Sequence, residues 1–143
     1  MINQDLKLAS ALLNECNSDG WTPLHVASNE GHVELIDIFH RFGSNVDCRA
    51  KTMRTPLHVA CIRGNFSVIK ALLQKGADVD AQDSDGNTPC HFCSEYGHSD
   101  CLELLLHMKH PQLVTKNKDN VSPLDVAVNK EILQVSIRII LQF

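Results

Sequence analysis

The chain has 143 residues, 43% of them hydrophobic and 21% charged, which is the balance of a folded globular protein and not of a disordered one. The net charge of −4 has the wrong sign for a nucleic-acid-binding protein, and no apolar run approaches the ~18 residues of a membrane span, so we expect no nucleic-acid partner and no membrane span. The first residues lack the basic start and apolar stretch of a signal peptide, which predicts a cytoplasmic or nuclear location.

Residues 1–16 have the pattern of an amphipathic helix. Apolar side chains recur there at steps of four and three residues, at Ile2, Leu6, Ala9, Leu13 and Cys16. Polar side chains follow the same steps on the opposite side. Because such an apolar stripe packs against a neighbour, we predict an N-terminal capping helix for the segment that follows.

A six-residue motif then occurs four times, beginning at Thr22, Thr55, Thr88 and Ser122. Its proline recurs at spacings of 33, 33 and 34 residues, so the chain contains an internal repeat. In each copy the threonine or serine can cap a helix whose first residue is the proline. In the first three copies a glycine follows that can end the helix, and a second apolar segment begins directly after it: Gly31, Gly64 and Gly97. Each unit is therefore predicted to contain two short antiparallel helices.

Polar turn segments such as residues 77–86 separate the units and are predicted to be projecting hairpin loops. One pair of short helices cannot bury its apolar faces alone, so the units must stack on one another. We assign the units to residues 17–49, 50–82, 83–116 and 117–143. The motif and its period resemble the ankyrin-repeat family. The resemblance implies an all-α repeat solenoid of helix-turn-helix units joined by β-hairpin loops, and a role as a protein–protein interaction scaffold.

The six cysteines and eight histidines raise the question of a metal site. The spacing Cys90-x2-Cys93-x4-His98-x2-Cys101 is close to the Cys-x2-Cys-x4-His-x4-Cys of a zinc knuckle. In the repeat register, however, the three cysteines align with apolar residues of the other units, namely Leu24, Leu57, Ala27, Ala60, Leu35 and Val68. We therefore expect buried thiols with no metal and no cofactor, and keep a zinc or redox site at Cys90 and Cys93 as the alternative.

Three histidines, His25, His58 and His91, each lie three residues after a capping threonine. One ring nitrogen can bond the threonine hydroxyl and the other can reach backbone, a pairing that the resemblance to ankyrin repeats implies is structural. The sequence offers no nucleophile with a base and an orienting acid, no phosphate-binding glycine loop and no paired carboxylates. We therefore predict that the chain is not an enzyme.

In ankyrin-repeat proteins the hairpin tips and the first helices form the recognition surface. On this chain the corresponding positions combine aromatic, apolar and basic residues, and we predict that partner-binding residues are Trp21, Met53, Arg54, Ile62, Arg63, Asn87 and Tyr96. Trp21 is expected to be exposed beside Arg54. The alternative is that it packs on the hairpin stem or makes a cation–π contact with Arg54. The patch would suit an acidic or amphipathic peptide.

The fourth unit departs from the pattern. Apolar residues are spread around most of the segment 132–143, Glu131 replaces the usual glycine, and one extra residue lies near residues 110–112. Because a terminal repeat normally has a polar outer face, we expect this C-terminal apolar helix to be covered by a further repeat, domain or subunit. The second functional hypothesis is therefore a targeting or regulatory ankyrin module of a longer enzyme or channel.

Overall fold

The computed structural model describes residues 2–108 and 113–142. Over these residues the chain is helical, with no β-strand. The helices are α1 (Ile2–Leu13), α2 (Pro23–Glu30), α3 (Val33–Arg41), α4 (Pro56–Arg63), α5 (Phe66–Gln74), α6 (Pro89–Glu95), α7 (Ser99–Met108) and α8 (Lys130–Gln142). None of them is long and apolar enough to cross a membrane.

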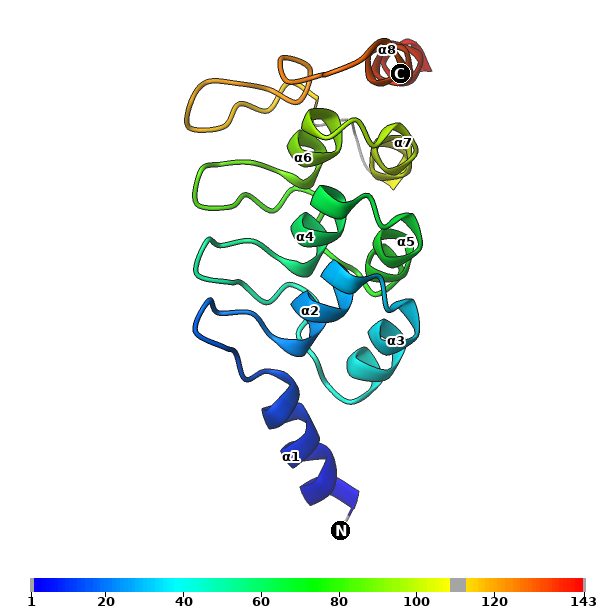
Figure 1. The fold of residues 1–143 in the computed structure, drawn as a ribbon. Helices are drawn as coiled ribbons and strands as arrows, with labels where there is room; N and C mark the ends of the chain where they lie inside the picture. Colours follow the sequence, from blue (N-terminus) through cyan, green and yellow to red (C-terminus); the bar gives the residue numbers. More distant parts are fainter. Residues whose placement is uncertain (1, 109–112, 143) are drawn as a thin grey trace.

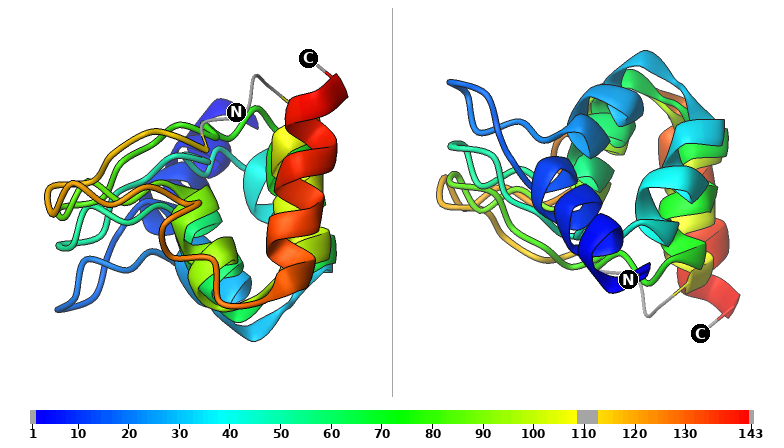
Figure 2. Two further views of the ribbon diagram at one scale, coloured as in Figure 1. Left: turned by 90° about the horizontal axis from the view of Figure 1, so that it is seen from above. Right: turned by 90° about the horizontal axis from the view of Figure 1, so that it is seen from below.

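The helices stack in two columns. The inner helices α2, α4 and α6 form one column, and the outer helices α3, α5, α7 and α8 form the other (Figure 1). Seen along the stack, the connecting loops project to the same side of the inner column (Figure 2). The predicted all-α repeat solenoid is therefore confirmed, with hairpin loops that contain no regular strand among the described residues.

Local sequence signals set the ends of the inner helices. Thr22, Thr55 and Thr88 precede α2, α4 and α6 in an extended conformation, and proline is the first residue of each helix. Gly31 and Gly64 end α2 and α4 in the left-handed conformation, with φ of 77° and 70°. Glycine adopts this conformation without the steric cost of a Cβ atom, so the helix ends where the sequence predicts.

The fourth unit corrects one prediction, because Ser122 does not open a helix. Residues 123–126 form a single turn instead. The Asp125 carboxylate accepts hydrogen bonds from the Ser122 backbone N–H at 2.8 Å and from its hydroxyl at 2.9 Å. The Asn129 side chain then accepts the backbone N–H of Ile132 at 2.9 Å and so caps α8. With Glu131 where the other units have glycine, the chain enters the outer helix without completing an inner one.

The core lies between the two helix columns. It is built from buried aliphatic side chains of successive units, including Leu24, Ile36, Leu57, Ile69, Leu72, Leu102, Leu105, Ile132 and Ile139. The α8 helix packs on α7 and leaves a row of apolar side chains exposed, Leu133, Ile137, Ile140 and Leu141. The extra residue that the sequence places near residues 110–112 lies outside the described residues.

The α1 helix meets the stack near its own C-terminal end. The Asn14 side chain donates to the carbonyl of Gly43 at 3.0 Å and accepts the backbone N–H of Asn45 at 2.9 Å. Ala9 and Leu13 are half-buried, whereas Leu6, from the same predicted stripe, is exposed. The helix therefore covers the end of α3 and diverges from the stack toward its N-terminus (Figure 1).

Candidate partner-binding face

The hairpin tips are joined in a ladder of backbone hydrogen bonds. The N–H of Lys51 donates to the Asp19 carbonyl at 3.1 Å, and the next tips repeat this contact from Ser84 to Thr52 and from Lys118 to Asp85, both at 2.9 Å. Equivalent residues of successive loops are thus held side by side. The loops and inner helices therefore form one continuous face.

Histidine side chains tie each inner helix to the next hairpin. In each of the first three units, Nδ1 lies 2.8–3.0 Å from the capping threonine hydroxyl and accepts the threonine backbone N–H. Nε2 lies 2.9–3.0 Å from a carbonyl oxygen of the following unit; the three pairs are His25–Arg54, His58–Asn87 and His91–Val121. Because Nδ1 accepts the threonine N–H while Nε2 donates to a carbonyl oxygen, each ring carries one proton and is neutral. The predicted structural role of these histidines is confirmed.

Burial favours the neutral ring at these sites. It lowers the pKa of His58 to about 4, against an ordinary value of 6.5, and it also lowers the pKa values of His25 and His91. The carbonyl hydrogen bond partly opposes this shift at each site. The three neutral rings therefore link successive units and hold them in register.

The cysteines of the apparent zinc motif occupy core positions. Cys90, Cys93 and Cys101 are buried, and burial raises the pKa of each thiol. The fourth residue of the motif, His98, directs Nε2 to the carbonyl of Ile62 at 3.1 Å. Within residues 2–108 and 113–142, no three His, Cys, Asp or Glu side chains are grouped so that they could hold a metal ion. The thiols take the place of apolar side chains, as the repeat register predicts.

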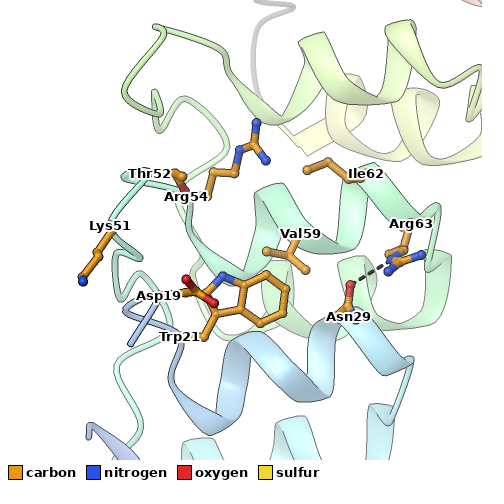
Figure 3. A pocket seen from close by; sticks show the side chains of 9 residues that line it. All are labelled: Asp19, Trp21, Asn29, Lys51, Thr52, Arg54, Val59, Ile62 and Arg63. Carbon is orange, nitrogen blue, oxygen red and sulfur yellow. Dashed lines mark hydrogen bonds between the residues drawn. The ribbon is translucent and has the colours of Figure 1, made fainter. Parts of the chain in front are cut away.

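A hollow of about 370 Å³ lies on the face between the first two units (Figure 3). Its lining comes from two hairpin tips and from helices α2 and α4: Asp19, Trp21, Asn29, Lys51, Thr52, Arg54, Val59, Ile62 and Arg63. Four of the predicted binding residues meet here, namely Trp21, Arg54, Ile62 and Arg63. The Trp21 indole forms one side of the hollow, opposite Val59 and Ile62 (Figure 3).

Arg54 faces the third unit and not the Trp21 ring. Its Nε donates to Asp83 Oδ2 at 3.3 Å, and its guanidinium carbon lies 4.8 Å from the centre of the Phe92 ring. Trp21 is half-buried and not exposed as predicted, because its ring stacks on His25, with ring centres 5.9 Å apart. The alternative cation–π contact between Trp21 and Arg54 is therefore wrong, although both residues line the same hollow.

The remaining predicted residues lie outside the hollow. Met53 is 46% exposed at a hairpin tip, and its φ of 62° puts it in the left-handed region. Tyr96 is 52% exposed and stacks on Phe92, with ring centres 6.5 Å apart, so it extends the face beyond Arg54. The Asn87 side chain instead accepts a hydrogen bond from Asn117 at 2.8 Å, within the hairpin ladder.

Five residues of the hollow were not among the predicted binding residues: Asp19, Asn29, Lys51, Thr52 and Val59. One of them, Val59, directly follows His58 and is aligned in the repeat with Val26 and Phe92. This register position could have identified it, because the residue after the histidine lies on the inner-helix face. Asp19, Lys51 and Thr52 lie in the predicted hairpin tips, but no sequence pattern distinguishes them from the other residues of those loops.

Comparison with known families agrees with this architecture. A family model described as ankyrin repeats (3 copies) matches three overlapping segments, residues 1–83, 27–117 and 76–136. A search of curated proteins found no match. Ankyrin repeats generally mediate protein–protein interactions and are typically non-catalytic. With the matched segments extending over most of its length, this chain belongs to the ankyrin-repeat family.

Proposed function

We propose that this chain is a non-catalytic scaffold that binds a partner protein or peptide through its hairpin tips and inner helices. The observation that carries this proposal is the hollow beside Trp21, where Ile62, Arg54 and Arg63 also meet. Tryptophan and arginine are the residue types most enriched at binding hot spots. Backbone hydrogen bonds between the hairpin tips hold equivalent residues of successive units in rows. This arrangement favours a partner that binds along the length of the face.

Three of the histidines and four of the cysteines have buried structural positions, which supports a role without catalysis. The three signature histidines are neutral and hydrogen-bonded at both nitrogens. The thiols of Cys61, Cys90, Cys93 and Cys101 are buried with raised pKa values, which disfavours the reactive thiolate.

Affinity capture from cells that express the protein, followed by mass spectrometry, tests the proposal. We expect a captured partner to bind the Trp21→Ala and Tyr96→Ala variants at least tenfold more weakly, because each change removes an aromatic contact on the face. Lys70→Ala, at an exposed position on α5, is the matched control and should bind as the unaltered chain does. A partner that is insensitive to the first two changes and lost with changes on the outer helices would contradict the proposed face.

The second candidate is a targeting or regulatory module of a longer enzyme or channel. It is favoured by the exposed apolar row on α8, Leu133, Ile137, Ile140 and Leu141. At this end of the stack Asp125 stands where the other units have the histidine, and it bonds Ser122 and Lys116. A carboxylate cannot donate the hydrogen bond that links the other units. A covering domain would therefore dock mainly on α8.

An Ile137→Glu change distinguishes the two candidates. It should abolish binding of a domain that docks on α8 and leave binding at the Trp21 face unchanged. Gel filtration with light scattering would report any self-association through the same row of side chains. Unchanged assembly and unchanged binding of every partner would argue against the module hypothesis.

A further inference from the structure

Two arginines stand at opposite ends of α4, on the same side as the hollow. Arg54 directly precedes the capping Thr55, and Arg63 is the last residue of the helix. The helix from Pro56 to Arg63 rises about 1.5 Å per residue, which is about 10 Å over its length, and Arg54 lies two residues before it. Val59 and Ile62, from the same helix, line the space between them (Figure 3).

Each guanidinium keeps hydrogen-bond donors for a ligand. Arg54 uses Nε for Asp83, and Arg63 uses Nε for the Asn29 side-chain oxygen at 2.8 Å. Neither of these contacts uses the terminal nitrogens of the guanidinium group. These forked N–H groups match the geometry of a carboxylate, and a charge-assisted pair of this kind is among the stronger hydrogen bonds.

The charge of the lining is opposite to that of the chain. Three cationic residues, Lys51, Arg54 and Arg63, line the hollow with one carboxylate, that of Asp19, whereas the whole chain has a net charge of −4. The buried Asp83 carboxylate, whose side chain is 1% exposed, neutralises part of the positive charge of Arg54. Arg63 has no carboxylate partner among the described residues. The hollow therefore attracts negative charge locally.

The apolar wall adds a second requirement. Trp21 and Ile62, both half-buried, offer a surface for an uncharged side chain between the two arginines, and Val59, which is only 3% exposed, lies beneath it (Figure 3). An extended peptide advances about 3.3 Å per residue, so two of its side chains that span the length of α4 are at least three residues apart. The ligand that satisfies both requirements has two acids with an apolar residue between them.

We propose that this hollow binds an extended acidic segment of a partner protein, in which two carboxylates at least three residues apart meet Arg54 and Arg63 and an apolar side chain between them contacts Trp21 and Ile62. This inference rests on the proposed scaffold function and specifies the chemistry of its ligand. The segment lies along α4 and is fixed at both ends by charge and in the middle by apolar contact.

The sole tryptophan of the chain provides a direct probe, because Trp21 lies in the hollow. We would titrate the full chain with the synthetic peptide GSDSLSDSG and follow the indole fluorescence. The expected result is a saturable change. Replacement of both aspartates by asparagine should weaken binding at least tenfold, and replacement of the leucine by serine at least fivefold. A peptide with its two aspartates adjacent should also bind more weakly.

Protein variants localise the contact. Arg63→Gln should weaken binding of the acidic peptide at least fivefold and leave binding of its asparagine analogue unchanged, whereas Lys70→Gln, on α5, should change neither. Arg54→Gln is combined with Asp83→Asn so that no buried carboxylate is left without its cation. The double variant should lose affinity for the acidic peptide as Arg63→Gln does.

Three outcomes would overturn the inference: equal affinity for the aspartate and asparagine peptides, an Arg63→Gln variant that behaves as Lys70→Gln does, or tighter binding of a single-stranded oligonucleotide than of the acidic peptide. If a captured partner depends on Trp21 while acidic peptides do not bind, the scaffold function stands and the acidic ligand is wrong. If neither a partner nor a peptide binds this face, both proposals fail.

Discussion

His58 Nε2 lies 3.0 Å from the backbone carbonyl oxygen of Asn87, a residue of the next unit. Its other ring nitrogen lies 2.9 Å from the Thr55 hydroxyl at the start of its own helix. One neutral side chain therefore fixes both the start of an inner helix and the position of the following hairpin. His25 and His91 make the same pair of contacts in their units.

This arrangement predicts that stability falls in mild acid. The folded protein holds the pKa of His58 at about 4 and lowers those of His25 and His91, whereas the unfolded chain has pKa values near 6.5. Below about pH 6.5 the unfolded state therefore binds more protons, and the free energy of unfolding decreases until the pH reaches the folded pKa. The shift at His58 corresponds to about 3 kcal/mol. Urea denaturation between about pH 7 and about pH 4.5, followed by circular dichroism, measures this loss.

The His58→Gln variant separates the histidine contribution from that of the carboxylates. Loss of the paired contacts should lower the free energy of unfolding at neutral pH by about 1–3 kcal/mol and flatten its pH dependence. His107→Gln is the matched control, because His107 is exposed near the end of α7 and contacts no neighbouring unit through a signature pair. An equal pH dependence in both variants would contradict the assignment.

The contact between Arg54 and Asp83 predicts a measurable coupling. Arg54→Met removes the cation from the buried Asp83 and should lower the free energy of unfolding by about 1–2 kcal/mol. This loss is smaller than for a fully buried ion pair, because Arg54 is partly exposed. Asp83→Asn keeps an oxygen for the N–H groups of Asp85 and Asn87. The double variant should therefore be more stable than the sum of the single changes predicts. Additive single changes in a double-mutant cycle would show that the pair is not coupled.

Two glycines with similar backbone angles should respond differently to alanine. A Cβ at Gly64 would lie 2.5 Å from His98 Nδ1, whereas a Cβ at Gly76 would meet nothing within 4 Å. Both positions have positive φ, so each substitution carries a backbone cost of about 1–2 kcal/mol. Gly64→Ala should lose at least about 1 kcal/mol more, because the ring it displaces bonds Ile62. Equal midpoints of chemical unfolding would contradict this steric explanation.

Met53 predicts a change that separates stability from binding. It occupies the tip position that is glycine at Gly20 and Gly86, and its φ of 62° resembles their 77° and 79°. Met53→Gly relieves left-handed strain but adds freedom to the unfolded chain, so the free energy of unfolding should rise by no more than about 1 kcal/mol. If the exposed side chain contacts the partner, binding should weaken in a calorimetric titration. A loss of stability of more than about 1 kcal/mol would show that Met53 supports the fold.

Local signals account for the parts of the fold that could be predicted. Thr22, Thr55 and Thr88 each stand directly before a proline that begins a helix, and these boundaries depend on a few consecutive residues. The same reasoning failed at Ser122. Asp125 bonds Ser122 as the histidines bond their threonines, but the turn is not continued as a helix, because Asn129 caps α8, which begins at Lys130. A repeat pattern alone does not predict where such a turn ends and where the next helix begins.

The position of the binding face could be predicted from the sequence, but the side-chain contacts on it could not. Alignment of the units brought Trp21, Ile62 and Arg63 to one surface, and the structure places all three around one hollow. The alignment could not predict that Arg54 points toward Phe92 and Asp83, because the orientation of this side chain depends on the packing of the neighbouring unit. The role of the hollow in binding stays a prediction for the titrations described above.

The sequence by itself determined the period of the repeat, the starts of three inner helices and the structural role of their histidines. The helix starts and the bond of each histidine to its threonine follow from capping, proline geometry and contacts within a few residues, whereas the second bond of each histidine spans about thirty residues. Only the tertiary structure decided how the last unit folds and which way Arg54 points. The reason is that stacking places groups about thirty residues apart in contact, such as Arg54 and Asp83, and their competition for hydrogen bonds and apolar surface is settled between units.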